Sequence, residues 1–176
     1  MALPFFTVGH STRPIPEFVD LLRAGQVELV IDIRTVPRSR TNPQFNADGL
    51  PETLAPYQIA HGRIDALGGL RGRSRDVPPE TNGWWQNRSF HNYADHALSP
   101  EFRSGLQELV RLGRRRRTAM MCAEAVWWRC HRRIVADHLL AAGETVYHLL
   151  DSDRVEPARL SAGASVGDGV VTYPKV

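Results

Sequence analysis

The sequence predicts an α/β fold, a single three-layer domain in which a mostly parallel sheet is flanked by helices. The first observation is that an apolar strand, an amphipathic helix and a second apolar strand follow one another within the first 34 residues. Such a unit joins parallel strands through a right-handed crossover. The second observation is that residues 28–34 (ELVIDIR) are almost continuously apolar, as in a strand covered on both faces. Strand and helix patterns then alternate to about residue 150.

Local signals predict the elements of the first half. Residues 5–9 (FFTVG) predict the first strand, and residues 16–25 predict a helix whose apolar side chains share one face. Residues 35–48 contain two prolines and favour a loop. Residues 49–57 then indicate a weak helix and residues 58–63 a short strand.

The irregular residues 62–89 are rich in glycine, proline and arginine and show no period. A loop of this length is usually a functional lid or a disordered segment, and Trp84 and Trp85 favour a lid that packs down. Residues 99–115 form the clearest helix, since Ser99 suits the N-cap and Pro100 the first helical position.

The second half continues the alternation of strands and helices. Residues 118–122 (TAMMC) and 145–150 predict strands, and residues 126–142 predict the helix between them. We therefore expect one domain over residues 1–160, followed by residues 161–176 as a tail or an edge strand.

The amino-acid composition limits the classes of protein to which this chain can belong. The chain of 176 residues is 42% hydrophobic and 23% charged, as in an ordinary soluble globular protein. Neither a signal-peptide pattern nor an apolar run of about 20 residues is present, so we expect a cytoplasmic protein that binds no membrane. The net charge is only +3, and Lys175 is the single lysine beside the arginines. The run Arg114–Arg117 is expected to be a solvated helix end.

Several reactive side chains follow the predicted strands. His10 and Ser11 follow the first strand, Arg34 ends the second, and Cys122 and Glu124 follow the third. In a parallel sheet these ends share one rim, where ligands bind. Cys122 would lie where a strand turns toward a helix N-terminus, which lowers the pKa of a thiol. The alternative is that Cys122 is a small apolar residue at a strand end.

The other sulfur and imidazole groups leave a metal alternative open. Cys130, inside the predicted helix, is interpreted as a core residue. Cys122, Cys130, His131 and His10 could supply four zinc ligands. The spacing Cys-x7-Cys-His lacks the close cysteine pair of structural zinc sites, so the sequence requires no metal or cofactor.

Several stretches carry a resemblance to a known family. They are TVGHST, IDIRTVPRSRTNPQF, LGG at 67–69, FHNY and MCAEAVWWRCHRRIVADHL. Over about residues 5–150 the chain resembles the domain-of-unknown-function family 488. The resemblance implies a small, single-domain, mostly bacterial α/β protein and supplies no activity. The signature positions it transfers to this sequence are Gly9, His10, Ser11, Asp32, Arg34, Pro37, Ser39, Leu67, Gly68, Gly69, Tyr93, Cys122, Glu124, Cys130, His131 and Arg132.

A more distant similarity is to the rhodanese-like fold, in which a cysteine after a strand opens an anion-binding loop. Here the nearest arginine that could close the loop is Arg129, which gives Cys-x6-Arg, a longer loop than in rhodaneses. Glu124 also brings a negative charge close to the thiol. The pair Trp127–Trp128 stands where other members of family 488 often have proline, which favours a different loop path.

The leading hypothesis is a cysteine-dependent enzyme, or an enzyme-like pocket, that binds a small anionic ligand at the rim. Cys122 would be the nucleophile, His131 or His10 the base, and Glu124 the residue that orients His131 or Arg132. The expected anion-binding residues are Arg34, Arg132, Ser11, Ser39, Gly68 and Gly69.

Two other interpretations compete with the enzyme. In the first, a nucleic-acid-binding or regulatory module uses the tryptophans to stack on bases, and exposed Trp84–Trp85 would suit a partner surface. Its phosphate contacts would be Arg38, Arg71, Arg73 and Arg75. In the second, the signature residues only form a hydrogen-bonded polar core. Substrate, reaction and oligomeric state are not predicted.

Overall fold

A computed structural model describes residues 2–176 and confirms the predicted fold class. The main sheet has the strand order β3-β2-β4-β1-β5-β6, in which the first five strands are parallel and β6 runs antiparallel to β5. The strands are β1 (Phe5–Gly9), β2 (Leu29–Asp32), β3 (Ala60–Arg63), β4 (Thr118–Cys122), β5 (Val146–Asp151) and β6 (Arg154–Pro157).

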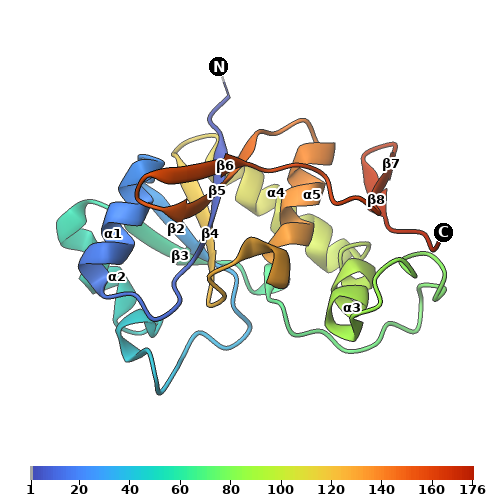
Figure 1. Cartoon of the computed structure of the whole chain (residues 1–176), viewed down its shortest axis with the longest axis horizontal. Coiled ribbons are helices and arrows are strands. Elements are labelled where there is room, and N and C mark those ends of the chain that lie inside the picture. Colours follow the sequence, from blue (N-terminus) through green and yellow to red (C-terminus); the bar gives the residue numbers. More distant parts are fainter. Residues whose placement is uncertain (1) are drawn as a thin grey trace.

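Helices cover both faces of this sheet, with α1 and α2 on one side and α4 and α5 on the other (Figure 1). The helices are α1 (Ile15–Ala24), α2 (Leu50–Leu54), α3 (Arg88–His96), α4 (Pro100–Gly113) and α5 (Arg132–Ala141). Side chains of β1 alternate between two cores, since Phe6 and Val8 pack with Phe18 of α1, and Phe5 packs with Leu109 of α4. The central strands are therefore buried on both faces.

Several elements differ from the sequence prediction, and β6 is one that no local signal predicted. Helix α5 begins at Arg132 rather than at residue 126, because residues Trp127–Arg129 form a short 3₁₀ helix first. Helix α3 begins inside the segment predicted as irregular. The tail forms β7 (Ser165–Gly167) and β8 (Val170–Thr172), which pair as a separate two-stranded sheet and not as an edge of the main one.

The segment between β3 and α3 packs against the C-terminal tail. Trp85 is buried, and its ring stacks on Phe90 and meets the ring of Tyr173 edge-on. The Asn82 side chain accepts a hydrogen bond from the backbone N–H of Tyr173 (2.9 Å). The prediction that the tryptophans pack down is confirmed for Trp85, and an exposed Trp84–Trp85 partner surface is wrong, because Trp84 is half-buried beside Trp85.

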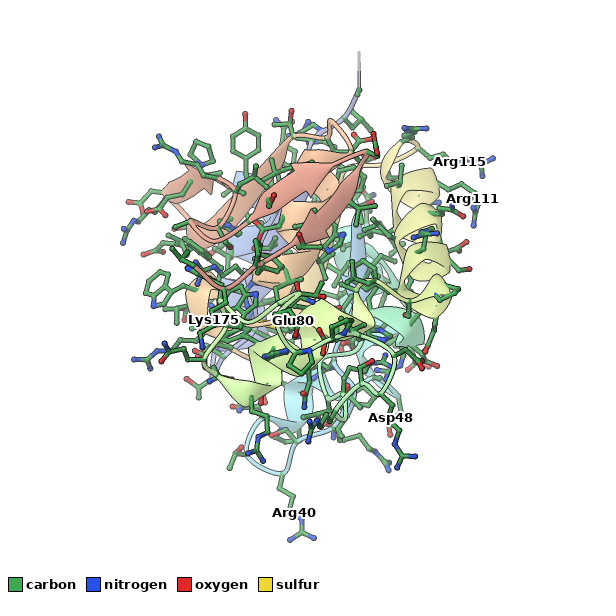
Figure 2. The ribbon with its side chains drawn as sticks, turned by 90° about the vertical axis from the view of Figure 1, so that its right-hand side faces the viewer. Arg40, Asp48, Glu80, Arg111, Arg115 and Lys175 are labelled. Atoms are coloured by element: carbon green, nitrogen blue, oxygen red, sulfur yellow. The ribbon has the colours of Figure 1, made fainter. Side chains whose placement is uncertain are left out.

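Much of the arginine excess lies on the surface. Arg111 and Arg115 project outward from the end of α4, and Arg40 extends from the tip of the loop after β2 (Figure 2). In the predicted solvated helix end, Arg114, Arg115 and Arg116 are exposed. No helix among residues 2–176 has the length and apolar character needed to cross a bilayer.

Candidate functional site

The parallel register brings the predicted residues to one rim of the sheet. Gly9 of β1 pairs with Cys122 of β4, and the backbone N–H of His10 donates to the carbonyl oxygen of Cys122 (2.9 Å). Two neighbouring hollows open on this rim and share Arg34 and Glu124 in their walls. The smaller, of about 260 Å³, is lined by His10, Ser11 and Ser39 among others. The larger, of about 440 Å³, is lined by Cys122, Cys130, His131, Gly69 and Arg129 among others.

Four of the five N–H groups of the Arg34 guanidinium donate to protein acceptors. It donates to both carboxylate oxygens of Asp32 (2.9 and 2.7 Å), to the carbonyl of Phe45 (2.7 Å) and to Nε2 of His10 (3.1 Å). The Nδ1–H of His10 then donates to the carbonyl of Ser11 (2.8 Å). Burial lowers the pKa of His10, which favours this neutral imidazole. Arg34 and neutral His10 thus form a cluster in which Asp32 balances the arginine charge, and Arg63 lies 3.8 Å from the same carboxylate.

A second buried arginine lies against the two cysteines. The sulfur atoms of Cys122 and Cys130 are 2.6 Å apart, and both side chains are almost completely buried. Nη1 of Arg132 donates to the Cys122 sulfur (2.6 Å) and to the carbonyl of Glu124 (2.6 Å). The backbone N–H of Arg132, at the start of α5, donates to the Cys130 sulfur (3.4 Å). One arginine therefore contacts both thiols, and no carboxylate is among its hydrogen-bond partners in residues 2–176.

The two thiols differ in acidity. Burial raises the pKa of Cys122 well above its ordinary value, and the hydrogen bond with Cys130 adds to this rise. Burial opposes ionisation of Cys130 too, but the hydrogen bond from Cys122 and the Arg132 charge together lower the pKa of Cys130 to about 7. These opposite pKa shifts favour one negative charge shared by the pair near neutral pH, with Cys130 as the more acidic thiol.

This result corrects two sequence-based interpretations. Cys130 is buried, as predicted for a core residue, but it precedes α5 and contacts the helix N-terminus rather than lying inside a helix. Cys122 was predicted to have the lowered pKa, whereas burial at the end of β4 raises it. Cys122 does lie at the end of a strand, as predicted. The thiol that accepts a hydrogen bond from a backbone N–H at the helix N-terminus is that of Cys130.

The orientation of Arg132 depends on two residues that the sequence reasoning did not select. Nε of Arg132 donates to the hydroxyl of Thr7 (3.2 Å), and the Thr7 oxygen lies 2.6 Å from Nδ1 of His148. The His148 ring stacks flat on Trp127 (4.4 Å between centroids). Thr7 and His148 are register partners on β1 and β5. In the sequence, Thr7 and His148 could have been found because each is a polar residue inside a stretch that is otherwise apolar.

His131 is fixed between the rim and the thiols. Its Nε2 lies 2.8 Å from the carbonyl of Ile33, which leaves Nδ1 to face the Cys130 sulfur at 3.5 Å. Tyr93 meets the imidazole edge-on, at 4.9 Å between ring centroids. A side chain at Gly69 would collide with the same ring, so glycine allows the close approach there. Burial lowers the pKa of His131, which keeps it a neutral acceptor toward Cys130.

Glu124 acts through its backbone rather than its carboxylate. Its carbonyl accepts from Arg132, and a side chain at Gly9 would overlap that carbonyl. The exposed carboxylate has one hydrogen bond, from the N–H of Val126 (3.4 Å). The expectation that the Glu124 side chain orients His131 or Arg132 is therefore wrong in its mechanism.

Comparison with known families places the chain in one of them. The family model described as "Domain of unknown function DUF488" matches residues 14–139, which is most of the chain. The chain belongs to this family. No curated protein and no solved structure gives a significant match, so the similarity to the rhodanese-like fold stays a prediction.

Of the remaining residues that the sequence analysis selected for anion binding, Ser11, Ser39 and Gly69 line the hollows, and Gly68 and Arg132 do not. Ser11 and Ser39 line the smaller one, where the Ser39 hydroxyl accepts from the N–H of Asn42 (3.1 Å). Gly68 is buried next to Thr35, and Gly69 lines the larger hollow. Arg132 is wholly buried and lines neither hollow, so the anion it meets is the internal thiolate and not a ligand.

The zinc alternative receives no geometric support. His10 uses both ring nitrogens in hydrogen bonds to Ser11 and Arg34 and does not join the cysteines. Among residues 2–176, no three or more histidine, cysteine or acidic side chains are arranged to hold a metal ion. The residues present do not fit a metal, and no chemical step below uses one.

Proposed function

We propose that this protein is a cysteine-dependent enzyme in which Cys130 attacks a small electrophilic substrate that carries an anionic group. The observation that supports it best is the buried thiol pair with an arginine that has no carboxylate partner, in the wall of a hollow of about 440 Å³. A thiolate is the reactive form of cysteine, and a pKa near 7 places it at working pH. His131 would accept the proton of Cys130 through Nδ1.

The walls of this hollow suit a small amphipathic molecule. Val36, Leu70 and Phe90 line it with apolar surface, and Arg129 is an exposed cation in the same wall. Arg34 lines it too, but four of its five guanidinium N–H groups are already used by Asp32, Phe45 and His10. We therefore transfer the anion-binding role from Arg34 and Arg132 to Arg129.

The test compares the anionic reagent iodoacetate with its neutral analogue iodoacetamide. Each alkylates thiolates, and a mass spectrum identifies the modified cysteine. We expect Cys130 to be alkylated at neutral pH and iodoacetate to be preferred, relative to free cysteine. Replacing Arg129 by Gln should remove that preference and leave the iodoacetamide rate unchanged. The matched control is Arg115→Gln, an exposed arginine just after the end of α4, which should change neither rate.

Two results would overturn this proposal. One is a Cys130 that reacts no faster than an ordinary thiol across pH 6 to 9, which removes the activated nucleophile. The other is an unchanged preference for iodoacetate in Arg129→Gln, which removes the assigned anion contact while leaving the nucleophile in place.

A phosphate-binding function is the second candidate, supported by a hollow of about 1030 Å³ beside α3. Arg73, Arg75 and Arg88 line it and are exposed. Arg71 is held by Glu101 (3.4 Å) instead, and the ring of Trp85 is packed against Tyr173 and Phe90. Arginine contacts to phosphate therefore remain in this candidate, and base stacking by Trp85 does not.

A labelled single-stranded oligonucleotide tests the second candidate. Its affinity should fall steeply with salt, and the triple variant Arg73→Gln, Arg75→Gln, Arg88→Gln should weaken binding at low salt. The matched control replaces three exposed arginines on and after α4, with Arg103→Gln, Arg115→Gln and Arg116→Gln. Equal loss in both triple variants indicates only a general charge effect and rejects this site.

A further inference from the structure

The two sulfur atoms lie within reach of a covalent bond. Their separation of 2.6 Å is only about 0.5 Å longer than a disulfide bond of about 2.05 Å. Cys122 ends β4 and Cys130 precedes α5, so the bond would link the end of a strand to the segment that leads into the next helix. These are the only two cysteines of the chain, so any disulfide within one molecule joins this pair.

Charge changes when such a bond forms. The dithiol form holds one negative charge next to Arg132, whereas a disulfide holds none. Arg132 is wholly buried, and in the disulfide form its remaining partners are neutral: the carbonyls of Glu124 and Ala125 and the Thr7 hydroxyl. Arg132 therefore stabilises the reduced form, and a couple whose reduced form is stabilised is a stronger oxidant.

We propose that Cys130 and Cys122 exchange two electrons with low-molecular-weight disulfides that enter the larger hollow. This inference rests on the proposed function, since it gives the same thiol site a defined electrophile, a disulfide sulfur. Both side chains line that hollow yet are only 3% and 5% exposed. Such limited exposure admits a small molecule and excludes a folded protein from direct contact with the sulfurs.

The reaction balances in two exchange steps. The Cys130 thiolate attacks one sulfur of the small disulfide, forms a mixed disulfide and releases one thiolate. Cys122 then attacks the Cys130 sulfur, the protein disulfide forms, and the second half leaves as a thiol that takes the proton of Cys122. The protein dithiol loses two electrons and the small disulfide gains them. In this cycle Cys130 is the attacking residue and Cys122 the resolving residue.

The experiment uses hydroxyethyl disulfide as the probe and follows the intact mass at neutral pH. We expect the wild-type chain to lose two hydrogens and become resistant to alkylation. Cys122→Ser should stop at the mixed disulfide on Cys130, and Cys130→Ser should react much more slowly. A wild-type protein that stops at the mixed disulfide, or equal rates in both single variants, overturns the cycle.

The alkylation and disulfide-exchange experiments together distinguish failure of the redox cycle from failure of the enzyme proposal. If Cys130 is alkylated rapidly but the wild-type chain never forms the internal disulfide, the enzyme proposal survives and the redox cycle fails. If the internal disulfide forms but Cys130 shows no lowered pKa and no preference for an anionic reagent, the redox cycle survives and the enzyme proposal fails.

The role of Arg132 is tested by the exchange equilibrium in buffers of the same disulfide and its thiol. Arg132→Gln should shift the equilibrium toward the protein disulfide by about tenfold, the effect of one pKa unit of lost thiolate stabilisation. Because Arg132 is wholly buried, Thr7→Val serves as a milder second variant that removes one acceptor and keeps the charge. Because the loss of a neutral acceptor leaves the Arg132 charge more dependent on the thiolate, Thr7→Val should shift the equilibrium toward the dithiol, by less than tenfold. No shift in either variant contradicts the stated charge argument.

Discussion

Arg34 and Arg132 are both buried arginines at the same rim of the sheet, but the charges beside them differ. Arg34 makes a bidentate ion pair with Asp32, at 2.9 and 2.7 Å, and a contact to a neutral His10. Arg132 contacts the Cys122 sulfur, two backbone carbonyls and a hydroxyl. In one cluster a carboxylate balances the arginine charge, and in the other only an ionised cysteine does.

This difference explains why two similar residues have different roles. A paired arginine fixes the chain where β2 ends and has little charge left to offer a neighbour. An arginine without a carboxylate keeps its full field in a region of low dielectric constant, where it favours a thiolate. Burial of a polar cluster therefore indicates function only after the partners of each charge are known.

The largest expected effect is on the paired cluster. Asp32→Asn leaves the Arg34 charge buried without its counter-ion, and breaking a buried pair in this way costs about 3–5 kcal/mol of unfolding free energy. Urea denaturation of the variant and the wild-type chain measures this difference. A loss below about 1 kcal/mol would show that Arg34 is not held by a carboxylate in the way described.

The next effect is the pH dependence of stability from the thiol pair. The unfolded chain keeps the ordinary cysteine pKa of 9.0, and the folded pKa of Cys130 is about 7. Between pH 7 and pH 9 the unfolded state thus holds a proton that the folded state has released, so stability rises with pH. The gain is on the order of 2 kcal/mol. This stabilisation is lost as the pH falls from 9 through the folded pKa of about 7.

Cys122 gives the opposite sign at higher pH. Its folded pKa is raised above 9.0, so above pH 9 the unfolded state ionises first and stability falls again. Denaturant midpoints measured from pH 6 to 10 should therefore pass through a maximum near pH 9. Cys130→Ser should remove the rise between pH 7 and 9, and a rise in that range that persists in this variant would assign it to another group. The rise below pH 7 should persist, because burial lowers the pKa of His10 and His131.

A smaller effect, on the reactivity of Cys130, is expected when Arg132 is given a carboxylate partner like the one that Arg34 has. Thr7→Asp places a carboxylate against Nε of Arg132, where the hydroxyl now accepts a hydrogen bond. The arginine charge is then matched, the pKa of Cys130 should rise, and alkylation at pH 7 should fall by about tenfold. Thr7→Asn is the matched control, since it adds a similar shape without charge and should keep most of the rate.

The sequence predicted the rim better than it predicted the chemistry at the rim. Continuous apolar strands and their parallel order are visible in the chain, and they place His10, Arg34 and Cys122 at one edge. The partners of Arg34 and Arg132 are partly backbone carbonyls, of Phe45 and of Glu124, and carbonyls leave no residue signal. Cys130 was misjudged because the 3₁₀ helix at Trp127–Arg129 delays the start of α5.

The smallest expected effect concerns the exposed carboxylate beside the thiols. Glu124→Gln keeps the backbone carbonyl that accepts from Arg132 and changes only a side chain exposed to solvent. Surface substitutions of this kind usually change stability by less than about 0.5 kcal/mol. The alkylation rate of Cys130 should stay within about twofold of wild type, because water screens the carboxylate from the buried pair. A rate that rises about tenfold would show that the carboxylate opposes the thiolate directly. The carboxylate would then have to be counted with Arg132 in the charge of the site.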